Sequence, residues 1–137
     1  MGSRLMALVL ASCALVSACG GGREEIVVEE TVGGANPYLW RASLDTMKEL
    51  PLISADSLGG VILYDWRSFD DAPDERIKAT VYILDTRLRA DGVNVTVSVQ
   101  KRVEGEWVDA DPSPDTNFQL ENRILERARN LKAAEIN

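Results

Sequence analysis

The sequence contains no histidine, which removes the most common general base and the most common transition-metal ligand. Cysteine occurs only at positions 13 and 19, so the rest of the chain has no thiol for catalysis or for a disulfide. There is no Gly-x-Ser-x-Gly elbow and no glycine loop of the kind that holds phosphate. A Ser–Lys dyad or a carboxylate pair is the catalytic chemistry still open. We expect a protein that is not an enzyme and uses no cofactor.

Long apolar runs are also absent, except for residues 5–16 near the N-terminus. This run is too short to span a bilayer, which needs ~20 residues, but it is typical of a signal peptide. Arg4 precedes it, and the small residues Ser17 and Ala18 follow it before Cys19. The pattern predicts a lipoprotein signal peptide over 1–18 and lipid attachment at the Cys19 sulfur. Cutting before Cys13 instead would leave a very short apolar segment.

The sequence has fewer basic than acidic side chains, 15 against 22. Removing residues 1–18 takes away Arg4 and changes the formal net charge from −7 to −8. A chain this acidic does not favour nucleic acid as a partner. The predicted partners are the membrane, reached through lipidated Cys19, and another envelope protein. Gly20 rather than aspartate follows the cysteine. This is typical of lipoproteins held at the periplasmic face of the outer membrane.

The mature chain is long enough for one domain. Residues 19–35 are rich in glycine and are expected to form a flexible tether after the lipid, and residues 36–137 a single domain. Asn36–Pro37 is a helix start, because asparagine caps and proline suits the first helical position. Pro51 should end this helix. A second helix is expected from Ser113–Pro114 to about residue 134, with Leu120, Ile124, Ala128 and Leu131 as its inner stripe.

Between these helices the apolar pattern alternates with period two. It predicts strands at 61–66, 77–83 and 93–100, and a short fourth strand at 107–108. Residues 52–57 are interpreted as a connector and residues 68–75 as a polar loop. The result is an α+β fold in which two helices cover one face of an antiparallel meander of three to four strands. The other face of the sheet is expected to meet water.

The acidic groups of the loops do not have the order of a calcium site, which needs alternating oxygens, a glycine and a final glutamate. They are Asp70, Asp71, Asp74 and Glu75 in one loop, and Asp109, Asp111 and Asp115 in another. We therefore predict no metal site there.

The candidate partner face is aromatic. If Val61 and Leu63 point to the helices, then Tyr64 and Trp66 lie on the open face of the sheet, where Tyr82 joins them. In the opposite register Tyr64 and Trp66 belong to the core. Both sides of this strand are apolar, so the sequence leaves the choice open.

Four stretches resemble a family of small alphaproteobacterial lipoproteins defined as a domain of unknown function. They are residues 36–45, 59–66, 81–92 and 119–125. The resemblance implies the lipoprotein class and brings no catalytic residue or cofactor. The architecture is also similar to that of accessory lipoproteins of the outer-membrane β-barrel assembly machine, which implies a fold and not a function.

These features together predict a membrane-anchored envelope lipoprotein that acts as a non-catalytic protein-binding or assembly module. The alternative is a module that binds a small ligand or lipid in an apolar groove between the helices and the sheet.

Overall fold

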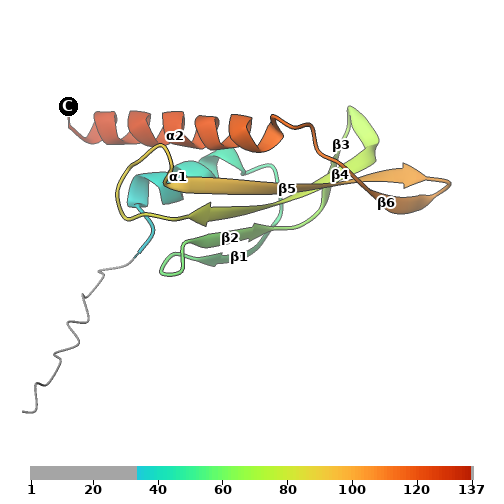
Figure 1. Ribbon diagram of the computed structural model, residues 1–137, viewed down its shortest axis with the longest axis horizontal. Coiled ribbons are helices and arrows are strands. Elements are labelled where there is room, and N and C mark those ends of the chain that lie inside the picture. Colours follow the sequence, from blue (N-terminus) through green and yellow to red (C-terminus); the bar gives the residue numbers. More distant parts are fainter. Residues whose placement is uncertain (1–33, 137) are drawn as a thin grey trace, which may run out of the picture.

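The computed structural model describes residues 34–136 (Figure 1). The predicted signal peptide, Cys19 and the tether up to residue 33 lie outside these residues. Within 34–136 the chain forms two helices and one six-stranded antiparallel sheet, which confirms the α+β class. The elements in order are α1 (Pro37–Thr46), β1 (Leu52–Asp56), β2 (Val61–Tyr64), β3 (Arg67–Phe69), β4 (Ala72–Ile83), β5 (Val93–Val103), β6 (Glu106–Ala110) and α2 (Thr116–Glu135).

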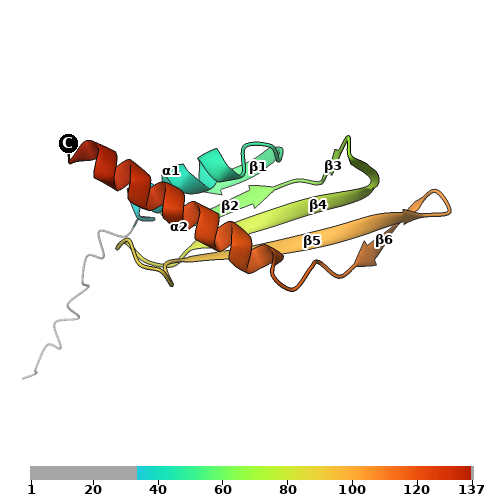
Figure 2. The same cartoon turned by 90° about the horizontal axis from the view of Figure 1, so that it is seen from above.

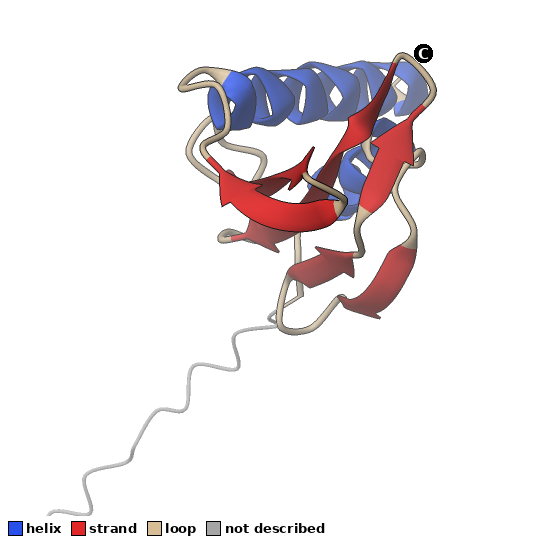
Figure 3. Ribbon diagram, turned by 90° about the vertical axis from the view of Figure 1, so that its right-hand side faces the viewer, coloured by secondary structure: helices blue, strands red, loops and turns tan. Residues whose placement is uncertain are grey.

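The sheet has the order β1-β2-β4-β5-β6, and the short β3 pairs with β4 beyond the end of β2. The pairing of β4 with β5 is the longest, from Glu75 opposite Lys101 to Ile83 opposite Val93. Both helices lie on one face of the sheet, so the domain has two layers (Figures 1 and 3). The far hairpins of β3–β4 and β5–β6 extend past the helices (Figure 2).

The sheet has more strands than the three to four predicted. The segment interpreted as a connector contains β1, and the polar loop contains most of β3 and the start of β4. These predictions were wrong because both segments are largely exposed and carry no clean apolar alternation. These segments become strands because their backbones pair with a neighbouring strand, as Arg67 of β3 does with Ile77 of β4.

The core confirms the alternation of the central strands. Every second residue from Val93 to Val99 on β5, and from Ala79 to Ile83 on β4, is buried. These side chains face the helices, where Leu39 of α1 and Ile124 of α2 are also fully buried. The residues between them point to the other face of the sheet.

The helix signals were partly right. Asn36 caps α1 and Pro37 occupies its first turn, as predicted, although α1 ends at Thr46, ahead of Pro51. The prediction that α2 follows Ser113–Pro114 directly was wrong, because the helix begins at Thr116 and Asp115 makes no side-chain cap bond. The inner stripe of α2 is confirmed: Ile124 and Ala128 are buried, and Leu120 and Leu131 pack against the core. Neither helix of the described part is long and apolar enough to cross a bilayer.

Candidate functional site

The structure divides the three aromatic residues of the predicted partner face. Ile62 and Tyr64 of β2 point into the core, and Tyr64 is only 4% exposed, so the placement of Tyr64 on the open face was wrong. The register is the reason: Val61 lies opposite Tyr82, and residues paired across a ladder share a face. Tyr82 is exposed on the open face, as predicted. Trp66 follows β2 and is half-buried.

Tyr64 is therefore a packing residue. Burial raises the pKa of its phenol to about 12. Its hydroxyl is buried and has no hydrogen-bond partner among the described residues. A neutral phenol enclosed by apolar side chains has no route to a docking partner on the other side of the sheet.

Trp66 instead belongs to a stack of alternating cations and rings, which we call the cation–aromatic stack. The Arg76 guanidinium lies between two rings, 4.8 Å from the Trp66 centroid and 4.5 Å from that of Trp107. The Lys78 ammonium lies 4.9 Å from the Trp66 centroid, and the Arg102 guanidinium lies 4.7 Å from the Trp107 centroid. Cations at such distances are attracted to the ring faces. Five side chains from β4, β5, β6 and the segment after β2 are thus ordered into one row.

Gln100 fixes the centre of this stack. Its Oε1 accepts a hydrogen bond of 2.8 Å from Nε of Arg76 and a second one from Nη2. Its Nε2 donates to Asp109 on β6 at 2.8 Å. Arg76 and Gln100 are opposite each other in the β4–β5 ladder and alternate with core residues, so the stack lies on the face away from the helices.

A groove of about 460 Å³ runs beside the stack. The stack residues Trp66 and Lys78 line it together with Ser98, Gln100 and Asp109. Val97, Val99, Ala110 and Pro112 also line the groove, but most of its exposed surface is polar, so the groove suits a polar surface better than an apolar small molecule.

The sequence analysis missed Arg76, Gln100 and Trp107 as site residues. A signal was present for Gln100 and for its neighbour in the groove, Lys78, because the alternation of the predicted strands 77–83 and 93–100 places both on polar faces. Arg76 lies one residue before the predicted strand and had no such signal. The sequence could not show that Trp107 and Trp66 lie near the same arginine. Their positions depend on β3 pairing with β4 and β6 pairing with β5, the neighbour of β4.

The remaining chemical candidates are not assembled into a site. Ser98 and Lys101 have the spacing of a Ser-x-x-Lys box, but three positions apart on a strand they point to opposite faces. The acidic residues of the loops do not gather either: residues 34–136 contain no group of three or more side chains that suits a metal ion.

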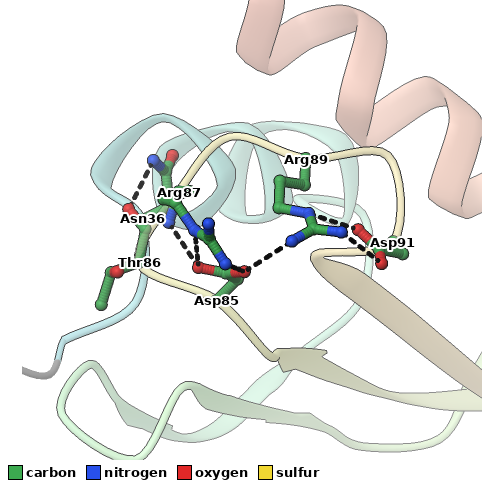
Figure 4. Close-up of polar contacts among 6 residues, drawn as sticks. All are labelled: Asn36, Asp85, Thr86, Arg87, Arg89 and Asp91. Carbon is green, nitrogen blue, oxygen red and sulfur yellow. Dashed lines mark hydrogen bonds and ion pairs between the residues drawn. The ribbon is translucent and has the colours of Figure 1, made fainter.

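A second polar cluster lies where the chain enters the domain (Figure 4). Asp85 accepts hydrogen bonds from the backbone N–H of Arg87 at 2.9 Å and from its guanidinium at 3.1 and 3.2 Å. These bonds hold the pKa of the Asp85 carboxyl below its usual range. Arg89 pairs with Asp91 at 3.0 Å. Asn36 donates from Nδ2 to the carbonyl of Thr86 at 3.0 Å, which ties this loop to α1.

Residues 33–133 match the family described as "Domain of unknown function (DUF3576)". The chain belongs to this family. The DUF3576 match includes the whole cation–aromatic stack and the polar cluster at the entry of the chain.

A similar protein is "Uncharacterized protein RP420" of Rickettsia prowazekii (strain Madrid E), 32% identical over 96 residues. The aligned part covers 70% of this chain and 58% of the Rickettsia protein, so the chain spans less than two thirds of that relative. The aligned part of this chain therefore corresponds to a portion of the Rickettsia protein.

Proposed function

We propose that this protein is an envelope lipoprotein whose domain binds another envelope protein and performs no catalysis. The observation that carries the proposal is the cation–aromatic stack on the face of the sheet opposite the helices. We further propose that acyl chains on Cys19 hold the protein at the periplasmic face of the outer membrane. The leader, Cys19 and Gly20 support this location.

The composition of the stack favours a protein partner. Tryptophan and arginine are the residue types that most often dominate binding between proteins. Trp66 and Trp107 are half-buried, so part of each ring contacts a cation of the stack and part remains open to a partner. Arg76 is already held by Gln100, and an ordered side chain loses less conformational entropy on binding.

Charge favours an acidic docking surface on the partner. The stack presents three cations, Arg76, Lys78 and Arg102, within a chain of net charge −7. Complementary charge speeds encounter and excludes partners of the wrong sign. We expect carboxylates of the partner to approach the edges of the guanidinium groups while apolar side chains contact the rings.

The test is photo-crosslinking in an alphaproteobacterial host that expresses the full chain. A photoreactive residue replaces either Ser98, which lines the groove, or Arg129, which is exposed on α2. We expect a protein adduct from position 98 and none from position 129. Trp107→Ala should abolish the adduct, whereas Phe118→Ala, an exposed aromatic residue of α2, should leave it unchanged. Equal adducts from both positions, or an adduct that survives Trp107→Ala, would contradict docking through this face.

Anchoring is tested separately by the intact mass of the protein purified from membranes. We expect a chain that begins at Cys19 and carries acyl groups. Such acyl chains would hold the protein to the membrane, because each buried methylene contributes ~0.8 kcal/mol. An unmodified Cys19 would refute the lipid anchor, and the proposal of a docking face would still be decided by the crosslinking experiment.

A second candidate, the binding of a small ligand or lipid, rests on a hollow of about 290 Å³ on the helix side of the sheet. Ile77, Val97 and Val99 line it together with the charged residues Glu75, Lys101 and Asp111, so a ligand there would need both an apolar part and a polar group. Native mass spectrometry of the protein extracted in mild detergent tests it. A bound molecule that is lost in Val99→Asp supports this function, and an empty protein excludes it.

A further inference from the structure

The three most exposed of the large apolar side chains in the described residues gather at one end of the domain. Leu58 is 80% exposed, Ile136 76% and Leu84 65%. Leu58 and Leu84 line one hollow together with Gly34 and Ala35, where the chain enters the domain. Ile136 follows α2, whose Glu135 accepts a hydrogen bond from Tyr38 in the first turn of α1. We call this region the entry end.

Backbone contacts fix the positions of Leu58 and Leu84. The N–H of Ala35 donates to the carbonyl of Ser57 at 2.8 Å, directly before Leu58. Gly60 has a φ of +69°, and a Cβ there would lie 2.4 Å from the carbonyl oxygen of Ile83. The turn that carries Leu58 is thus packed tightly against the end of β4, next to Leu84.

We propose that the entry end is a membrane-contact surface, and that Leu58, Leu84 and Ile136 insert into the boundary between lipid headgroups and acyl chains. This inference rests on the proposed anchor at Cys19. Gly34 lies fifteen positions after Cys19 in the sequence. A segment of this length reaches at most ~50 Å when fully extended. The part of the domain that meets the bilayer first is therefore the entry end.

Tethering makes a weak contact effective. A short covalent tether to the membrane holds the attached surface at an effective concentration on the order of millimolar. Three aliphatic side chains that bind a bilayer only transiently as a free domain would then be in contact for much of the time.

The arginines of the entry end are already paired, Arg87 with Asp85 and Arg89 with Asp91. Asp56 in the turn that carries Leu58 and Glu135 before Ile136 add carboxylates to this end, so we expect it to meet neutral rather than anionic headgroups. The opposite end, where Figure 1 shows the far hairpins, carries charges of both signs, because Asp70, Asp71 and Glu104 lie close in sequence to Arg67 and Arg102. The contact would direct the cation–aromatic stack away from the membrane surface, toward a partner.

The test uses the full chain expressed in a bacterial host, purified as the lipoprotein and reconstituted into phosphatidylcholine vesicles. A fluorescent label is attached to a cysteine introduced as Leu58→Cys, Leu84→Cys or Ile136→Cys. Phe118→Cys and Val103→Cys are the matched controls, because both residues are exposed and apolar but lie away from the entry end. The readout is quenching of the label by a nitroxide on the lipid acyl chain.

We expect at least about twofold stronger quenching at 58, 84 and 136 than at 103 and 118, because interfacial apolar faces lie roughly 5–10 Å into the headgroup–acyl boundary. Quenching should persist in high salt, since the arginines of the entry end are already paired. Equal quenching at all five positions overturns the inference. Loss of quenching in high salt also overturns the inference, because it would show that arginine side chains bind lipid phosphate groups and that the apolar side chains do not insert.

The intact mass, measured first, separates this inference from the proposed anchor. If Cys19 carries no acyl chain, the anchor fails, and the labelled variants are rebuilt with Cys13→Ser and Cys19→Ser and an N-terminal histidine tag. Vesicles with a nickel-chelating lipid then hold the chain at the same end. The same pattern of quenching supports the entry end as a membrane surface even without native lipid, and a uniform pattern rejects it.

Discussion

Asn36 joins the start of α1 to the loop after β4, and we predict that Asn36→Ala destabilises the domain by about 2–3 kcal/mol. Its Oδ1 accepts hydrogen bonds of 3.0 Å from the N–H groups of Tyr38 and Leu39. Its Nδ2 donates to the carbonyl of Thr86 at 3.0 Å (Figure 4). The side chain is 6% exposed, so water does not replace these bonds freely.

The magnitude follows from the separate bonds. Loss of an asparagine cap costs about 1 kcal/mol, within a range of roughly 0.5–2. The N–H of Leu39 is buried, and leaving it without an acceptor places the cost in the upper part of that range. The bond to Thr86 contributes about 1 kcal/mol more. Thr86 is exposed, so its carbonyl can bind water and adds no further penalty.

Two further variants separate these contributions. Asn36→Ser keeps a cap oxygen but is too short to reach Thr86, so we expect a loss of about 1 kcal/mol. Asn122→Ala, on the exposed side of α2, should change stability by no more than about 0.5 kcal/mol. The measurement is urea denaturation of the chain without its leader, with midpoints compared at a shared slope.

Two results would refute this reasoning. A loss below about 0.5 kcal/mol in Asn36→Ala would mean that the three hydrogen bonds do not hold the entry of the chain. An equal loss in Asn36→Ser and Asn36→Ala would mean that the cap oxygen contributes nothing.

Three other predictions follow from single residues. Tyr64→Phe should raise stability by about 1 kcal/mol in thermal denaturation, because it removes a buried hydroxyl that lacks a partner; a loss would show that the hydroxyl is satisfied. The pKa of Asp85 is lowered by Arg87, so its stabilising effect is complete above the usual aspartate pKa and disappears as pH falls through the lowered one. The stability difference between wild type and Asp85→Asn, followed by circular dichroism, should therefore shrink on acidification, and a constant difference contradicts the pairing. Gly60→Ala should destabilise more than Gly105→Ala in the same assay: both glycines have positive φ, but only at Gly60 would the Cβ clash with backbone, and equal losses would exclude that clash.

Much of the fold was predictable from local pattern. The alternation from Val93 to Val99 placed one face of β5 in the core, because successive side chains of a strand point to opposite faces. Asn36–Pro37 predicted the start of α1 through capping and the fixed φ of proline. The two-layer arrangement followed from helices that need a sheet to cover their apolar stripes.

The candidate site was less predictable. The sequence analysis named Tyr64, Trp66 and Tyr82 as the candidate partner face, and the polar face of the predicted strand 93–100 already contained Gln100. β2 is apolar on both sides, so only its pairing with β4 assigned Tyr64 to the core and Tyr82 to the surface.

What the sequence determined by itself was therefore periodic or chemical: the alternation of the strands, the start of α1, and the absence of histidine throughout the chain. Only the tertiary structure decided the register of β2 and brought Trp66 and Trp107 to the two sides of Arg76. The physical reason is that alternation is a property of one strand, whereas register and cross-strand contact depend on how several strands pair.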